Sequence, residues 1–373
     1  MSGDIMRLLF IKLKHIGDVF LLTPTLDAVR CRYPDAEISV LVRKGTEGIL
    51  AGCSAIDRVY VTVAAERENR TRGDAWATVR LIRQLRETEF DTVFVISPED
   101  RASVYGILMR ARNRIMAPCA RSKLAKQLAV FYKVAPLSIA GSHEVERSFA
   151  VAREVLDLPS RPGSLQFREA VGAGGRLIPE GRNYAVLHTA TRWPTKGWPV
   201  EHWVSFIERI IDRFDTLVVS VGPAREEVAM GRLIARGFDS RVISTEGQLS
   251  WSQLAALIRG SKLFLGVDTA AMHLAAACDI PIVALFGPSR KCFWRPWTDA
   301  PCVVLSDPHY IGENDTFADH CIDRRVEAIT PSMVVDAVDQ VIEDAEIPKT
   351  KEAISERWGD LFSTPTLDYA IPG

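Results

Sequence analysis

Short apolar runs alternate with helix-like segments along most of the chain, and this alternation restricts the possible folds more than any other feature. In the first part, the runs RLLFIK, EISVLV, RVYVTV and DTVFVIS are rich in Val and Ile and predict strands. Between these strands, residues 19–33, 75–88 and 102–112 predict helices. Alternating strands and helices form a parallel sheet that is covered on both faces. The first part is therefore predicted to be an α/β, doubly wound unit.

A stretch rich in Gly and Pro, RPGSLQFREAVGAGGRLIPEGR, interrupts the pattern at residues 161–182. Its glycines neither follow a strand nor open a helix, so they do not form a dinucleotide-binding fingerprint. The pattern then restarts, with strand-like runs YAVLH, TLVVSVG, RVIST, KLFLGVD, PIVALFG and CVVL and predicted helices at 200–213, 226–236, 251–259, 270–277 and 331–344. We expect a first domain over 1–165, a linker over 166–182, a second domain over 183–348, and a tail over 349–373 that packs on the first domain or frays.

Composition narrows the class of protein. The formal net charge of −1 argues against wholesale nucleic-acid binding. The cysteines are odd in number, scattered and without a CxxC pair, which favours a reducing compartment: they are Cys31, Cys53, Cys119, Cys278, Cys292, Cys302 and Cys321. No apolar run approaches the roughly 18 residues of a membrane span. We expect a cytoplasmic protein, with room for a peripheral contact with a membrane.

The segment KLKHIGD places Asp18 between the first predicted strand and the first predicted helix. An N-cap or first-turn aspartate at this position would stabilise the helix by roughly 0.5–2 kcal/mol. The functional alternative is a general base, because ligands of open parallel sheets bind beyond the carboxyl ends of the strands. Lys12, Lys14 and His15 would hold the pKa of Asp18 low if they point at it.

The segment GVDTAAMH forms a second turn from a strand into a helix. Asp268 or Thr269 can cap this helix, whose first amides would then face a bound phosphate. Thr269 and His273 are four residues apart and share a helix face, from which the His could donate to a phosphate oxygen. The alternative is a capped helix with a packed core His, which is less plausible for the whole Asp-Thr-x-x-x-His set.

Two basic loops also follow predicted strands of the second part. In LHTATRWPTKGWP, Lys196 is a candidate counter-charge for a phosphate, or simply a solvated Lys in a turn between core tryptophans. In LFGPSRKCFWRPW, the turn at Gly287 would let the backbone approach a ligand, and Arg290, Lys291 and Arg295 either suit an anion or are solvated.

Basic residues at 67–72 and 120–127 read most simply as an exposed loop and helix face, or alternatively as contacts to an anionic acceptor. The chain has no GxSxG elbow, no Walker loop, no HExxH and no metal-ligand spacing of His and Cys, so no metal site is predicted.

Taken in this order, the motifs resemble glycosyltransferase family 9, the lipopolysaccharide heptosyltransferase family of Gram-negative bacteria. The resemblance covers roughly residues 7–345 and is carried by KLKHIGDVFLLTPTLDAVRCRYPDAEISVLV, by HEVERSFAVAREVLDL and, most specifically, by FLGVDTAAMHLAAACDIPIVALFGPS. It implies the GT-B fold, in which two Rossmann-like domains face a cleft. It also implies an inverting, metal-independent and cofactor-free transfer of a sugar, typically from ADP-heptose, to the lipopolysaccharide inner core or a lipid A precursor at the inner membrane.

Carried over residue by residue, the resemblance makes Asp18 the general base. It implies that Lys196 holds the donor phosphates, and that the rest of the donor site consists of Thr189, Asp268, Thr269, Ala270, His273 and Gly287. The acceptor would lie near 67–72 and 101–126, with contacts from Lys14, His15, Arg67, Arg70, Arg72 and Lys123.

Two departures from the family pattern concern the donor. The family commonly has Pro-Gly where this chain has Thr189-Ala190, and an acidic residue where it has Arg290. Another nucleotide sugar therefore stays open. Two other functions also stay open: a sugar-nucleotide epimerase of the same fold, which needs no acceptor, and a non-catalytic nucleotide-sugar binder, which needs no base at Asp18.

Overall fold

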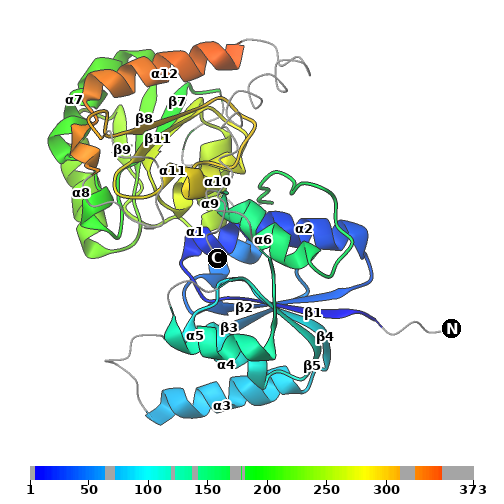
Figure 1. Ribbon diagram of the computed structural model, residues 1–373. Coiled ribbons are helices and arrows are strands. Elements are labelled where there is room, and N and C mark those ends of the chain that lie inside the picture. The colour runs from blue at the N-terminus through cyan, green and yellow to red at the C-terminus, as the bar shows by residue number, and fades with distance from the viewer. Residues whose placement is uncertain are drawn as a thin grey trace.

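The computed structural model describes residues 5–63, 72–118, 122–136, 142–168, 178, 181–310 and 324–346. They form two parallel sheets of six strands each, one per half of the chain (Figure 1). The predicted α/β fold with two doubly wound units is therefore confirmed. The predicted tail 349–373 and most of the predicted linker 166–182 lie outside the described residues, so the domain boundaries stay predictions.

The first sheet has the order β3-β2-β1-β4-β5-β6, and all its neighbouring strands are parallel. Its strands are β1 (Arg7–Lys12), β2 (Glu37–Arg43), β3 (Arg58–Thr62), β4 (Phe90–Val95), β5 (Ala111–Met116) and β6 (Lys133–Val134). The helices are α1 (Ile16–Phe20), α2 (Thr23–Arg32), α3 (Arg72–Arg86), α4 (Asp100–Leu108), α5 (Lys123–Leu128) and α6 (Glu144–Arg153). The central strand β1 is buried on both faces, which explains its unbroken apolar run.

The second sheet has the order β12-β11-β10-β7-β8-β9, again with all neighbours parallel. Its strands are β7 (Tyr184–His188), β8 (Thr216–Ser220), β9 (Val242–Ser244), β10 (Leu263–Val267), β11 (Ile282–Phe286) and β12 (Cys302–Ser306). The helices are α7 (Val200–Ile210), α8 (Arg225–Arg236), α9 (Trp251–Arg259), α10 (Ala270–Ala276), α11 (Lys291–Trp294) and α12 (Pro331–Glu346). Every predicted strand and helix of this half is confirmed to within a few residues, and α11 is added.

Two predicted helices of the first half are wrong in extent. The predicted helix 19–33 is broken between α1 and α2, where Pro24 stands in the first turn of α2 and lacks the amide that a continuous helix would need. The predicted helix 102–112 ends at Leu108, and Ala111 begins β5. The strand escaped prediction because its sequence, ARNRIM, carries two arginines and no run of β-branched residues.

A central cluster of buried side chains spans both halves. It joins the inner face of each sheet to α1, α2 and α6 from the first half and to α9 and α10 from the second. Figure 1 shows these helices between the two sheets. Two further clusters fill the outer faces, one under α3 and α4 and the other under α7 and α12. The two sheets therefore share one core along the surface where they meet.

Helix α6 connects the halves at its first turn. His143 is its N-cap, and the His143 Nε2–H donates to the backbone carbonyl of Arg295 at 2.8 Å. The imidazole also lies against the Trp297 ring, with 4.8 Å between ring centroids. Burial lowers the pKa of His143 to about 3, so the ring is neutral, and its Nδ1 accepts from the amide of Val145.

Candidate active site

The strands β11, β10 and β7 are neighbours in the second sheet and end at the same edge. Gly287 follows β11, Asp268 follows β10 and Thr189 follows β7. A Cβ on Gly287 would lie 3.1 Å from the Thr195 carbonyl oxygen and 3.2 Å from the Val326 Cβ, so this turn approaches the Lys196 loop closely. All the predicted donor-site residues lie at this edge.

Lys196 closes the short helix η4 (Pro194–Lys196). Its Nζ lies 2.6 Å from the Asp268 Oδ2, and the two side chains are only 15% and 6% exposed. The alternative of a solvated Lys in a turn is therefore wrong. Its flanking tryptophans differ, because Trp198 is buried and donates to the Ile329 carbonyl, whereas Trp193 is 52% exposed.

The start of α10 carries buried polar groups with unused hydrogen-bonding capacity. Thr269 is the N-cap, Ala270 is the first residue and His273 lies one turn along the helix, 3% exposed. Burial lowers the pKa of His273 to about 4, and the Lys196 charge adds to this while Asp268 opposes it. The ring is therefore neutral near pH 7. At this edge of the second sheet, four buried side-chain atoms of described residues have no hydrogen-bond partner: Thr269 Oγ1, His273 Nδ1, Thr189 Oγ1 and Ser289 Oγ.

Helix α1 brings the first half against α10. A Cβ on Gly17 would lie 3.1 Å from the His273 Cδ2 and 3.7 Å from the Ala270 Cα. A side chain at position 17 would push His273 away by a few tenths of an ångström, so the glycine is favoured here by packing rather than by backbone conformation. Asp18 follows directly, in the first turn of α1, while His15 occupies the N-cap position. The contact thus places the predicted base beside the predicted donor helix.

The electrostatics of Asp18 differ from the expectation. Burial raises the pKa of Asp18 to about 6, and the nearby Glu144 charge adds to the rise. Lys12, Lys14 and a hydrogen bond with the His15 backbone oppose the rise without cancelling it. The expected low pKa is not found because desolvation by burial outweighs the two lysines, although both of them do lower the pKa.

Lys12 and Lys14 are each paired with another carboxylate, and the two ion pairs differ in burial. The Lys12 Nζ lies 2.7 Å from the Glu144 Oε1 and 3.0 Å from the Ser148 Oγ, and Lys12 is fully buried. The Lys14 Nζ lies 2.5 Å from the Glu99 Oε1, and both side chains are partly exposed. Sequence reasoning missed Glu144, because it is 132 residues from Lys12 in the chain and no local pattern links them.

The predicted acceptor residues are only partly assembled. Lys14 and His15 lie beside Asp18, and Trp193 of the second half reaches His15 edge-on, with 6.2 Å between ring centroids. Arg67 and Arg70 lie outside the described residues, and Arg72 is the first residue of α3. Lys123 begins α5 and is exposed.

One basic residue of the loop after β11 is buried rather than solvated. Arg290 is 3% exposed, and its Cζ lies 3.9 Å from the centroid of the Phe293 ring. Arg147 of α6 approaches the same ring from the first half, at 5.3 Å. The loop is therefore part of the contact between the halves.

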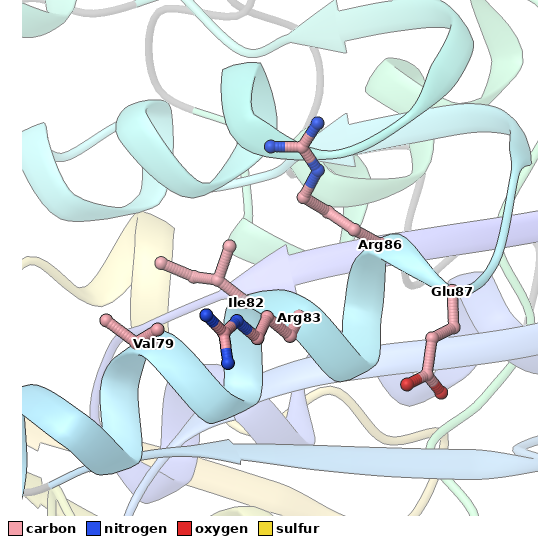
Figure 2. Close-up of a pocket in the computed structure, with 5 residues that line it drawn as sticks. All are labelled: Val79, Ile82, Arg83, Arg86 and Glu87. Carbon is pink, nitrogen blue, oxygen red and sulfur yellow. The ribbon is translucent and has the colours of Figure 1, made fainter.

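Figure 2 shows a surface pocket beside α3. Its lining residues, Val79, Ile82, Arg83, Arg86 and Glu87, all lie on or just after α3. This end of α3 leads into the amino end of β4, so the pocket is at the opposite edge of the first sheet from Asp18. Within the described ranges no three His, Cys, Asp or Glu side chains gather in a way that could hold a metal ion, and no helix is long and apolar enough to cross a bilayer.

Known proteins resemble the chain over most of its length. The family model for glycosyltransferase family 9 (heptosyltransferase) matches residues 78–317. Lipopolysaccharide heptosyltransferase 3 of Escherichia coli is 28% identical over 295 residues, which cover 76% of this chain and 84% of that protein. Lipopolysaccharide heptosyltransferase 1 of Pseudomonas aeruginosa is 29% identical over 301 residues, covering 77% and 80%.

Solved structures show the same fold. E. coli heptosyltransferase WaaC with ADP superposes with a TM-score of 0.74 at 22% identity, covering 90% of this chain and 99% of that one. A glycosyl transferase family 9 protein from Veillonella parvula gives a TM-score of 0.75 at 18% identity, covering 92% and 99%. The GT-B fold expected from the resemblance is confirmed, and the family match extends over more than half of the sequence. The chain therefore belongs to glycosyltransferase family 9, the heptosyltransferase family.

Proposed function

We propose that the chain transfers a heptose from ADP-heptose to the lipopolysaccharide inner core, with inversion at the anomeric carbon and without a metal ion. Relatives from two organisms are named lipopolysaccharide heptosyltransferases. Solved E. coli relatives were determined with ADP and with ADP-2-deoxy-2-fluoro heptose. Family membership favours transfer over epimerisation or binding alone.

The contact between Gly17 and His273 carries the proposal. It holds the helix that bears Asp18 against the helix whose first residues would bind the donor diphosphate. A group-transfer enzyme needs its base and its leaving-group site within one substrate length of each other. Here each half would supply one of them, and the approach of Gly17 to His273 supports this arrangement.

Asp18 would act as the general base. With a pKa of about 6, it is mostly ionised near pH 7 and accepts a proton more readily than an unperturbed aspartate. It would take the proton of the acceptor hydroxyl while that oxygen attacks the anomeric carbon from the face opposite the leaving group. One base is sufficient, because inversion takes place in a single displacement.

The leaving diphosphate would be stabilised from the second half. As the bond between the anomeric carbon and the phosphate oxygen breaks, negative charge develops near Lys196, which Asp268 holds in place. The Thr269 hydroxyl and the His273 ring are buried and have unused hydrogen-bonding capacity. As a neutral ring, His273 can donate through one nitrogen while it accepts through the other.

The acceptor would approach from the side of Lys14 and His15. Burial and the charges of Arg43, Arg192 and Lys14 lower the pKa of His15, so several cations surround this position. Cations favour an acceptor that carries acidic groups. Because the lipid part of such an acceptor is anchored in a membrane, the enzyme would act at the cytoplasmic face of the inner membrane.

Donor binding and turnover test the proposal separately. By calorimetry without added metal, we expect the wild type to bind ADP-heptose more tightly than UDP-GlcNAc or GDP-mannose. Lys196→Ala should weaken donor binding about 100-fold, whereas the matched control Lys262→Ala, on the surface, should not. Asp18→Asn should keep donor binding and lose roughly 10²–10⁴-fold in turnover.

The alternatives give different results. Release of an altered nucleotide sugar without acceptor would indicate an epimerase. Full turnover by Asp18→Asn would refute the role of Asp18 as the base. Preference for another nucleotide sugar would keep the mechanism and change the donor.

A further inference from the structure

Apolar side chains project into solvent along one edge of the first half. In the turn after α5, Val130 is 79% exposed and Phe131 is 61% exposed. Leu124, earlier in the chain, is 40% exposed, and Val134, later in the chain, is 41% exposed. Four exposed aliphatic and aromatic residues within one short segment are unusual on a monomer surface and indicate a contact site.

The same segment is basic. Residues 122–136 contain three lysines and no Asp or Glu. Lys133 is paired with Glu154, whereas Lys123 and Lys126 project from α5 and are exposed. We use the term docking face for Leu124, Val130, Phe131 and Val134 together with Lys123 and Lys126. Apolar side chains flanked by lysines are complementary to a surface that has an apolar interior and an outer layer of negatively charged groups.

The docking face lies next to the candidate active site. Lys14, which neighbours Asp18, pairs with Glu99, the N-cap of α4. The next residue, Asp100, accepts a hydrogen bond from Ser122, the N-cap of α5. These contacts connect the base to the start of α5, and α5 lies against α4 in the lower half of Figure 1. An acceptor held at the docking face would therefore be near Asp18.

We propose that the docking face binds the surface of a membrane that contains anionic lipid. The side chains of Val130 and Phe131 would enter the boundary between headgroups and acyl chains, while Lys123 and Lys126 would contact the headgroup phosphates. This inference rests on the proposed function, because an acceptor anchored in the membrane must be reached by an enzyme without a described membrane-spanning helix. The docking face would hold Asp18 near the acceptor sugar.

Cosedimentation of the full chain with vesicles tests the docking face. The wild type should bind vesicles of phosphatidylethanolamine and phosphatidylglycerol, and should not bind phosphatidylcholine alone. The double variant Val130→Ser/Phe131→Ser should bind at least about tenfold more weakly, because the burial of two apolar side chains on binding is lost. Lys126→Glu should weaken binding by about tenfold, since a lysine near such a surface contributes about fivefold and the glutamate adds repulsion.

Matched controls are available in the second half. Leu233, on α8, is 57% exposed, so Leu233→Ser removes a comparable apolar side chain at a distance from the docking face. Lys262→Glu reverses an exposed charge there. Neither control should change vesicle binding. Equal binding by the wild type and Val130→Ser/Phe131→Ser, or wild-type binding to neutral vesicles only, would overturn the proposal.

Two further readouts separate the remaining outcomes. On a deacylated, soluble acceptor, Val130→Ser/Phe131→Ser should turn over like the wild type, whereas on an acceptor embedded in vesicles it should be slower. A wild type that binds anionic vesicles but is inactive on both acceptors would refute the proposed function and leave the docking face standing. A dimeric wild type and a monomeric double variant with equal vesicle binding would assign the face to a second copy instead.

Discussion

The raised pKa of Asp18 predicts a stability effect that is independent of any substrate. Ionising a carboxyl whose folded-state pKa is about 6 is harder in the folded chain than in the unfolded chain, where the reference value is 3.8. The difference corresponds to about 3 kcal/mol, at 1.36 kcal/mol per pKa unit. The contribution of Asp18 to the stability of the folded protein is therefore fully present when the pH is below the unfolded-state pKa. It is lost as the pH rises through the folded-state pKa.

Asp18→Asn removes this loss, because the amide has a similar shape and no charge to bury. In urea unfolding measured from pH 5 to pH 8, the variant should gain about 1.4 kcal/mol relative to the wild type, with little further change above pH 7. Any packing effect of the amide is the same at each pH and cancels in this comparison.

Asp35→Asn is the matched control, because Asp35 is exposed in the turn after α2. It should change stability by less than about 0.5 kcal/mol throughout. A stability difference between Asp18→Asn and the wild type that stays constant with pH would refute the raised pKa. So would a wild-type kcat/KM that does not fall as pH drops through about 6, since a protonated Asp18 cannot accept a proton.

Two further substitutions test the packing around the site. Gly17→Ala puts a Cβ 3.1 Å from the Cδ2 of the buried His273, so kcat should fall at least about tenfold. The alanine also raises helix stability by about 1 kcal/mol, which should keep the urea midpoint near that of the wild type. Gly237→Ala is the control, because a Cβ there meets no other atom, and equal kcat for both variants would contradict the tight approach. Lys12→Met removes the nearer cation from the buried Glu144, which keeps only Arg147 at 3.4 Å. It should lower the unfolding free energy by about 3 kcal/mol, against less than about 1 kcal/mol for Lys14→Met at the exposed pair. Equal losses would show that burial does not separate the two pairs.

The sequence predicted the second half nearly completely, because each strand there is a short Val- or Ile-rich run bounded by turn residues. The helix over 251–259, for example, has a Ser N-cap and a Gly after its last turn, and both bounds were correct. The first half was harder. Strand β5 contains charged residues, because it lies near the edge of the sheet, and its pattern therefore looked like the end of a helix.

The candidate site was predictable where a strand-end motif marks it, and unpredictable where it depends on distant contacts. Asp268, Thr269 and His273 form one local motif, and the structure places them with Lys196. The two effects that raise the pKa of Asp18 are not local: Glu144 lies on α6, and the dominant burial depends on the packing around α1, where Gly17 lies against His273 of the second half. No pattern along the chain encodes that burial.

Helix α6 makes the two halves interdependent in folding. Its residues precede the predicted linker, yet its N-cap His143 contacts the Arg295 carbonyl and the Trp297 ring, which follow that linker in the chain. A first half produced alone would leave the His143 ring without its acceptor and would uncover part of the central cluster. The chain therefore contains two sheets but one cooperative unit, and a substitution in α6 should destabilise the second half as well as the first.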